Sequence, residues 1–248
     1  MSRRNRLRSV LTLVQLNGLI PIRTTPLYLL NTVASPLSFL FFIFIVSHGT
    51  YLDFGITGGM VLTMLTVGTG LQSDLTHYRH DLRFQDVVVA SPVEAPIYVA
   101  GMALSELVYS LPALAVFVAL FFAWGHPTVM SVVVITGVVL LVWGFASALA
   151  FTLATYFEDV RETFLFSPMI SLVLTVLPPV YYPLSALPAW AQAVARISPT
   201  TYAAGLVQGA CGLAPLTLSD AELDWAVLVA FTVALFLLAA FKARWREP

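Results

Sequence analysis

Residues 129–156 read VMSVVVITGVVLLVWGFASALAFTLATY, and no charged side chain interrupts them. A helix needs about 20 apolar residues to cross the roughly 30 Å hydrocarbon core of a bilayer. Only helices and closed barrels satisfy their own backbone hydrogen bonds in lipid, and an apolar run this long is helical. The stretch therefore predicts a transmembrane helix, and the pattern recurs along the chain.

The overall composition points the same way. Of the 248 residues, 59% are hydrophobic and only 10% are charged, whereas soluble domains carry about 25% charge. A soluble chain this apolar would expose patches large enough to aggregate. We therefore expect an all-α, polytopic membrane protein that forms one transmembrane domain over residues 1–248.

Six apolar runs are long enough to span a bilayer, and the Pro178-Pro179 pair should break the fifth of them. The predicted spans are 27–47, 54–73, 96–123, 129–156, 164–182 and 223–241.

The basic residues predict the orientation of these spans. Of the 12 lysines and arginines, all but Arg196 fall in segments that six spans place on one side. Positive residues accumulate on the cytoplasmic side of membrane proteins. We therefore expect a multi-pass protein of the cytoplasmic (inner) membrane with both termini in the cytoplasm.

The first 25 residues precede the first span. Leu7, Val10, Leu11 and Val14 recur at helical spacing, which is typical of an amphipathic helix lying in the cytoplasmic interface. A disordered basic tail is the alternative that composition leaves open.

Cofactor and metal motifs are not found in the sequence. The only lysine, Lys242, follows Phe241, so the Gly-Lys-Ser/Thr step of a phosphate-binding P-loop is absent. Cys211 is the only cysteine, and His77 and His80 lack a third histidine or cysteine nearby. We expect no catalytic residue, no metal site and no cofactor in this chain, so that any ATP and Mg²⁺ would bind a partner subunit.

The predicted cytoplasmic loop 74–95 carries dense charge followed by an apolar stretch. A short helix from Asp81 to Val89 would place Phe84 and Val87 on one face, and Pro92 would end it. Such a helix could dock in a groove of a partner, or the loop could merely connect two spans; spacing alone leaves both open. The second cytoplasmic cluster, Glu158 to Glu162, could likewise be a charged turn.

Two further features could carry function. Glu106 is the only acid well inside a predicted span, and an intramembrane acid is costly enough to suggest a function. It could contact cargo or relay a proton, or it could pair structurally with a neighbouring group. The outer segment 183–222 is rich in proline and includes an apolar run, Ala189 to Ile197, too short to span. It predicts re-entrant or interfacial helices that cap the bundle.

Two stretches resemble the permease subunit of type-2 ABC exporters, which move drugs, polysaccharides or lipid-linked glycans. Asp86-Val-Val-Val-Ala-Ser91-Pro92-Val93 is similar to the coupling-helix region of that family, with Asp86 in place of the usual Glu and Arg83 where Gly is common. Tyr182-Pro183-Leu-Ser-Ala-Leu187-Pro188-Ala-Trp190, followed by Ser198-Pro199-Thr200, is similar to its outer signature. Gln208 stands where that family often has a basic residue, and Pro178-Pro179 where it commonly has Ser-Gly.

The resemblance implies a subunit that pairs with a second copy or a homologous permease, while each permease binds an ABC ATPase. Hydrophobic or amphipathic small molecules, lipids or glycans would be the cargo, and no nucleic acid would bind. It implies ATPase coupling through Arg79, Asp81, Arg83, Phe84, Asp86, Val87, Glu158, Asp159 and Arg161. It implies a translocation path and outer gate that include Glu106, Tyr181, Tyr182, Pro183, Pro188 and Trp190.

A secondary active transporter that uses Glu106 as a coupling acid is the alternative. Such transporters place coupling acids or broken helices in matched halves, and this chain has one candidate acid and no clear internal repeat. A membrane enzyme ranks third because no catalytic constellation is present in the sequence.

Overall fold

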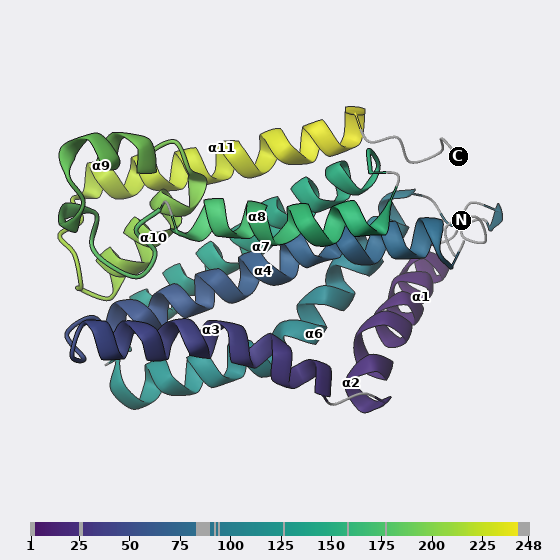
Figure 1. Cartoon of the computed structure of the whole chain (residues 1–248). Helices are drawn as coiled ribbons and strands as arrows, with labels where there is room; N and C mark the ends of the chain where they lie inside the picture. Colours follow the sequence, from purple (N-terminus) through teal and green to yellow (C-terminus); the bar gives the residue numbers. More distant parts are fainter. Residues whose placement is uncertain are drawn as a thin grey trace.

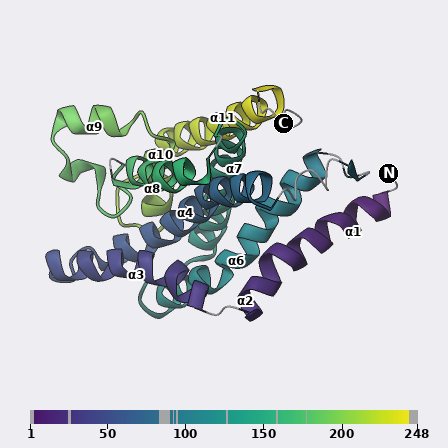
Figure 2. The same ribbon diagram turned by 45° about the vertical axis from the view of Figure 1, so that its right-hand side comes forward.

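The computed structural model describes residues 3–24, 27–82, 90–91, 93, 95–125, 127–157, 159–176 and 178–242. These residues form helices joined by short turns, without a strand. The long helices lie side by side, as Figures 1 and 2 show. The first of them are α3 (Leu27–Val46), α4 (Leu52–His80) and α6 (Ala95–Trp124), and the others are α7 (Val129–Ala154), α8 (Val160–Val176) and α11 (Leu218–Lys242).

Four of these helices are long and apolar enough to cross a membrane: Leu52–His80, Ile97–Trp124, Val129–Ala154 and Leu218–Phe241. They correspond to the second, third, fourth and sixth predicted spans. The first predicted span corresponds to α3, whose apolar part, Pro36–Val46, is shorter than a membrane span. The fifth corresponds to α8, which has 17 residues and is also short for a span. A multi-pass membrane protein is thus confirmed, while the number six stays a prediction.

The helix α4 lies at the centre of the bundle, and its neighbours are α3, α6, α7, α8 and α10. Two glycines let other segments approach its backbone closely. A Cβ on Gly68 would lie 2.5 Å from Cβ of Ala146 on α7, and one on Gly58 would lie 2.4 Å from the carbonyl oxygen of Val180. Small residues of this kind permit close helix packing in membranes.

Hydroxyl side chains inside α4 are satisfied within the helix. Thr63, Thr69 and Thr76 donate to carbonyl oxygens one turn earlier, at 2.7, 2.9 and 2.8 Å. These bonds matter because a membrane interior offers no water to an unpaired polar group.

The N-terminal segment is helical, as the sequence predicts. It comprises α1 (Arg3–Val14), a π-helical turn η1 (Gln15–Leu19) and α2 (Ile20–Thr24). It packs against α6: the Ser105 hydroxyl donates to the Leu13 carbonyl oxygen at 3.2 Å, and Gly18 lies against the Ser105 backbone. Leu7 and Leu11 stay exposed on α1, consistent with an interfacial helix.

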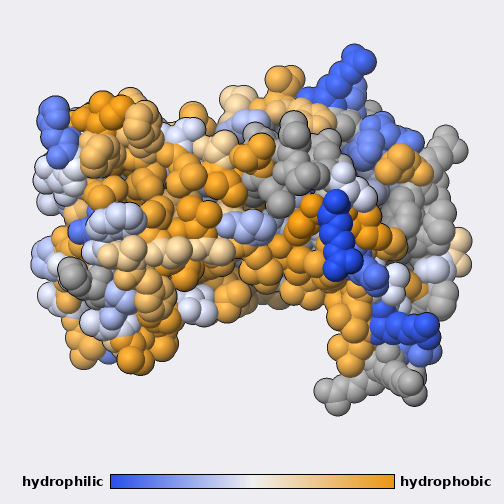
Figure 3. All heavy atoms as spheres, turned by 90° about the horizontal axis from the view of Figure 1, so that it is seen from below, coloured by the Kyte–Doolittle hydropathy of each residue, from blue (hydrophilic) through white to orange (hydrophobic). Residues whose placement is uncertain are grey.

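The segment between α8 and α11 folds into short helices. These are the 3₁₀ turn η2 (Leu184–Ala186), α9 (Ala189–Ala195) and α10 (Pro199–Ala210). They lie at the left end of the bundle in Figure 1, whereas α1 begins and α11 ends at the opposite end. The face in Figure 3 is mainly hydrophobic along the middle of the molecule, and most of its hydrophilic residues lie toward the two ends.

Three predicted boundaries are wrong. The helix α4 continues to His80, so residues 74–80 belong to a helix rather than to the loop 74–95. The helix α8 ends at Val176, so Tyr181 and Tyr182 lie in irregular backbone beyond it, and α11 begins at Leu218, inside the predicted outer segment 183–222. In each case the boundary of the apolar run in the sequence and the boundary of the helix fall at different residues.

Candidate functional site

The C-terminal end of α4 is fastened to the turn that joins α7 and α8. A guanidinium nitrogen of Arg79, Nη1, donates to the carbonyl oxygen of Thr155 at 3.1 Å. The ring nitrogen Nε2 of His80 lies 3.2 Å from the carbonyl oxygen of Phe157. The carbonyl oxygens that follow the last turn of α7 have no partner within that helix, and donors from another element satisfy them. Arg79 and His80 therefore tie together two segments far apart in sequence, and we call these two contacts the α4 clamp.

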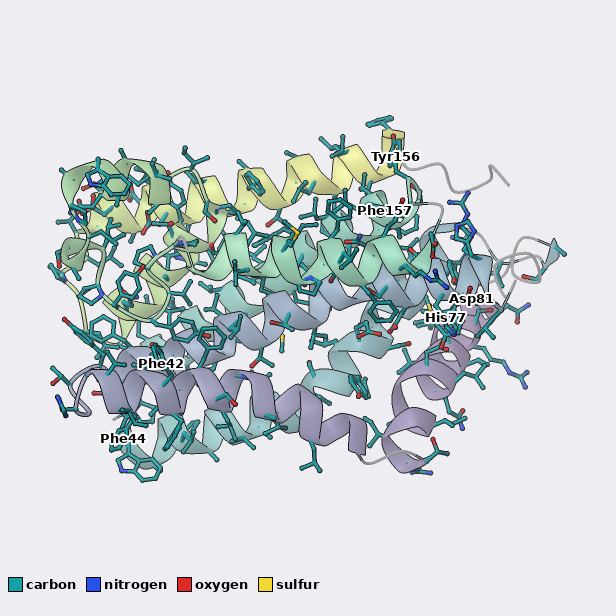
Figure 4. The ribbon with its side chains drawn as sticks, in the orientation of Figure 1. Phe42, Phe44, His77, Asp81, Tyr156 and Phe157 are labelled. Carbon is teal, nitrogen blue, oxygen red and sulfur yellow. The ribbon has the colours of Figure 1, made fainter. Side chains whose placement is uncertain are left out.

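Asp81 follows directly after the α4 clamp. Its Oδ2 atom lies 2.6 Å from Nδ1 of His77, one turn earlier. Both side chains are exposed, and Figure 4 shows them at the same end of the bundle as Tyr156 and Phe157. This pair stabilises the last turn of α4, where the chain leaves the helix toward residues 83–89.

The α7–α8 turn has its own internal contacts. Asp159 Oδ1 accepts a hydrogen bond from the backbone N–H of Arg161 at 2.8 Å, which fixes the start of α8. The rings of Phe157 and Phe166 stack with centroids 5.3 Å apart. The structure thus brings Arg79, Asp81, Asp159 and Arg161 of the predicted coupling set to the same end of the bundle.

The remaining predicted coupling residues lie outside the described residues. They are Arg83, Phe84, Asp86, Val87 and Glu158.

Glu106 has a partner that sequence analysis assigned to a loop. It is buried on α6 and lies close enough to Asp74 of α4 for the two side chains to interact. The pair links α6 to α4 two turns before the α4 clamp. This contact supports the interpretation that Glu106 pairs structurally with a neighbouring group. The sequence did not indicate Asp74 as that group, because it did not predict that α4 extends to His80.

A second candidate region lies at the opposite end, where the chain leaves α8. The rings of Tyr181 and Phe39 of α3 stack with centroids 5.7 Å apart and planes 6° apart. Tyr181 is buried, and burial raises the pKa of its hydroxyl above the ordinary value. Because Val180 lies against Gly58, this segment packs on both α3 and α4. We call residues 178–182 the outer hinge.

Gln208 holds the outer hinge in place from α10. Its buried amide nitrogen donates to the carbonyl oxygens of Pro179 at 2.9 Å and Tyr182 at 3.3 Å. Pro178-Pro179 cannot continue a helix and leaves carbonyl oxygens without helical partners. Gln208 satisfies two of these carbonyls, a role that its position in the sequence did not predict.

The other predicted outer residues are placed differently. Pro183 and Pro188 directly precede η2 and α9, where the fixed φ of proline is compatible with a helix start. Trp190 is 73% exposed on α9. Thr200 donates to the carbonyl oxygen of Leu174 on α8 at 2.6 Å, which joins the start of α10 to the fifth predicted span.

The sequence motifs thus lie in two sets, the α4 clamp at one end and the outer hinge at the other, joined by α4. No curated protein matches the chain. The family model described as ABC-2 type transporter matches residues 9–211, which include every helix from η1 to α10. The chain belongs to the ABC-2 type transporter family, and it is therefore a membrane transport component of the ABC permease kind.

Proposed function

We propose that this chain is the membrane-spanning permease subunit of an ATP-driven exporter. Two permeases, identical or homologous, would form the translocation path between them, and each would bind a separate ABC ATPase that holds ATP and Mg²⁺. Family membership supports the permease and, in general terms, an ABC ATPase partner.

The observation that carries the coupling proposal is the α4 clamp. The helix α4 ends next to the α7–α8 turn, where Arg79 and His80 bind carbonyl oxygens of that turn, and the predicted coupling segment follows α4 in the sequence. A displacement of this segment by an ATPase would therefore act on α4 and α7 together. Because α4 is the most buried of the four candidate spans, its movement would reach the other helices packed on it.

The outer hinge is the proposed exit gate. Its contacts include the Tyr181–Phe39 stack, the approach of Val180 to Gly58 and the two hydrogen bonds from Gln208. Gly58 lies on α4, so the hinge contacts the same helix that carries the α4 clamp at its other end. Movement of α4 would thus loosen the packing under the hinge.

The exposed surfaces support the proposed cargo class. Large apolar side chains are exposed along α3, α8 and α11, among them Phe42, Met169 and Phe236. Such faces require lipid or a second permease as a neighbour. A path between two permeases with such faces suits a hydrophobic or amphipathic molecule.

Co-purification tests this proposal. The chain would be expressed with candidate ABC ATPases of its source and solubilised in mild detergent, and the mass and stoichiometry of the purified complex would be measured. We expect two permeases with two ATPases, and we expect deletion of residues 77–90 to abolish the association. A matched control, Arg196→Ala at the opposite end, should keep the ATPase bound. A stable permease that captures no ATPase would contradict the proposal.

The secondary-transporter alternative has one supporting observation, the proximity of two acidic side chains, Asp74 and Glu106, on neighbouring helices. Proteoliposomes that carry the chain alone would decide it. Cargo uptake driven by a pH gradient without ATP, and lost in Glu106→Gln, would favour this alternative over the exporter.

A further inference from the structure

A cavity of about 230 Å³ opens at the end of the bundle that carries α9 and α10. Its walls come from three places in the chain: the start of α4, the end of α6 and the residues after α10. Among the lining residues are Asp53, Thr57, Phe121, Trp124 and Cys211. Neither the α4 clamp nor the outer hinge contributes to these walls.

The described residues that line the cavity include one acid, Asp53, and no basic side chain. The carboxylate of Asp53 is close enough to Cys211 to raise the pKa of the thiol, after the larger effect of burial. Two helices also end at the cavity, α6 at Trp124 and α10 just before Cys211, and the C-terminal end of a helix favours cations.

The apolar part of the wall contains two aromatic residues, Phe121 and Trp124, beside the aliphatic Ile56 and Leu213. Phe121 is buried at 3% exposure and contributes its ring, whereas Trp124 is exposed at the rim. Aromatic faces attract cations within about 6 Å of the ring centroid, tryptophan most strongly. A carboxylate beside aromatic rings is the combination that recognises ammonium groups.

We propose that this cavity binds the ammonium head of a small organic cation, with Asp53 as its counter-ion and the rings of Phe121 and Trp124 as its walls. The volume is below the roughly 300–1,000 Å³ of pockets that enclose a whole drug-sized ligand. It accommodates a head group while the rest of the ligand extends outward. The head group comes from a dissolved amine or from a phospholipid, and the experiment separates these sources. This proposal is independent of the exporter mechanism.

Cys211 provides a native reporter, because it is the only cysteine of the chain and it lines the cavity. The rate of maleimide labelling would be measured on the full chain in detergent, with tetramethylammonium chloride as the probe. Sodium chloride at equal concentration controls for ionic strength. We expect tetramethylammonium, and not sodium, to slow labelling, by roughly tenfold at about ten times its Kd.

The variants decide whether Asp53 is the counter-ion. Asp53→Asn should lose the protection, Asp53→Glu should retain part of it, and Trp124→Leu should weaken it. Glu222→Gln, an exposed acid at the same end, should behave as the native chain. A thermal melt of each variant excludes misfolding as the cause. Equal labelling in both salts, or equal protection in native chain and Asp53→Asn, would overturn the proposal.

Nanodiscs separate the two sources of the head group. If phospholipid is the ligand, Cys211 should label more slowly in phosphatidylcholine than in phosphatidylglycerol, and Asp53→Asn should remove the difference. If a dissolved amine is the ligand, both lipids should give the same rate and tetramethylammonium should protect in each. Protection by neither lipid nor tetramethylammonium rejects the site.

Discussion

At the scale of single residues, the absence of a side chain at Gly58 and Gly68 decides how closely other segments approach α4. Both positions face backbone atoms. A Cβ at Gly58 would meet the carbonyl oxygen of Val180, and a Cβ at Gly68 would lie 3.2 Å from the amide nitrogen of Ser147. Backbone cannot rotate away as a flexible side chain can, so any added methyl group must displace a segment.

Gly58→Ala and Gly68→Ala should each destabilise the chain, by about 1–3 kcal/mol, as overpacked core positions do. Gly70→Ala is the matched control on the same helix, because a Cβ there meets no atom within 4 Å. It should stabilise α4 by about 0.5–1 kcal/mol through higher helix propensity. Thermal melts in detergent compare the three, and equal melting temperatures for Gly58→Ala and Gly70→Ala would contradict the packing at Gly58.

Cys211 shows how a local environment changes reactivity. Burial, and then the Asp53 charge, raise the pKa of its thiol to about 11 from the ordinary value of 9.0. The thiolate is the reacting form, so at pH 8 labelling should be roughly 100-fold slower in the folded chain than in the denatured chain.

The rate in the folded chain should still climb between pH 9 and pH 10.5, where the denatured chain levels off. Asp53→Asn should raise the folded rate only in part, since burial is the larger cause. Stopped-flow labelling across this range checks both statements. A folded rate that levels off near pH 9 would show that the thiol is not perturbed.

Asp74 marks the limit of sequence analysis at this scale. Hydropathy places Asp74 just beyond the second span, because charge becomes dense there. The structure extends α4 by two turns to His80, where Asp74 meets Glu106. Hydropathy reports where apolar residues end, whereas the helix ends where its backbone bonds end, and the two differ whenever neighbouring helices satisfy the polar side chains.

At the scale of elements, α4 connects the two candidate regions. Its last turn carries the α4 clamp, and Gly58 near its start supports the outer hinge. The sequence could predict α4 as a span, but it could not show that Arg79 binds Thr155, because 76 residues separate them. Contacts of this range depend on how the helices pack.

Arg79→Ala should free the α7–α8 turn from α4. We expect faster amide hydrogen exchange over residues 153–159 and lower transport per ATP hydrolysed, while the spans remain folded. Arg79→Lys should keep part of the effect, since a lysine can bind one carbonyl oxygen but lacks the planar guanidinium. Arg8→Ala on α1, an exposed arginine from the same end, is the control and should leave both readouts unchanged. An unchanged exchange rate in Arg79→Ala would contradict a role for the α4 clamp.

Gln208→Leu should release the outer hinge. It leaves the carbonyl oxygens of Pro179 and Tyr182 without their donor, which costs about 1–3 kcal/mol for buried groups. Limited proteolysis from the outer side should cut residues 178–188 faster. Gln192→Leu, which loses a single partly buried bond to Leu187, should have a smaller effect. Equal cleavage in both variants would contradict the hinge assignment.

At the scale of the whole molecule, the two sides that the basic residues predict correspond to the two ends of the helical bundle. The α4 clamp, the beginning of α1 and the end of α11 share one end, and α9 and α10 lie at the other (Figure 1). The sequence predicted this division, because basic residues and apolar runs alternate along the chain. It could not predict the packing partners of the outer hinge, since Tyr181 and Gln208 carry no periodic signal.

The orientation of these two ends in the membrane is the last prediction. In a Cys211→Ser background, Leu82→Cys marks the clamp end and Trp190→Cys marks the outer end, and both native side chains are exposed, at 57% and 73%. A membrane-impermeant maleimide should label Trp190→Cys in intact cells and Leu82→Cys only in inverted vesicles, because positive residues stay in the cytoplasm. Labelling of both positions from one side would mean an even number of spans between them, instead of the three that the sequence predicts. Labelling in the reverse order would invert the molecule and place the α4 clamp beyond the reach of a cytoplasmic ATPase, so this experiment tests the coupling proposal as well.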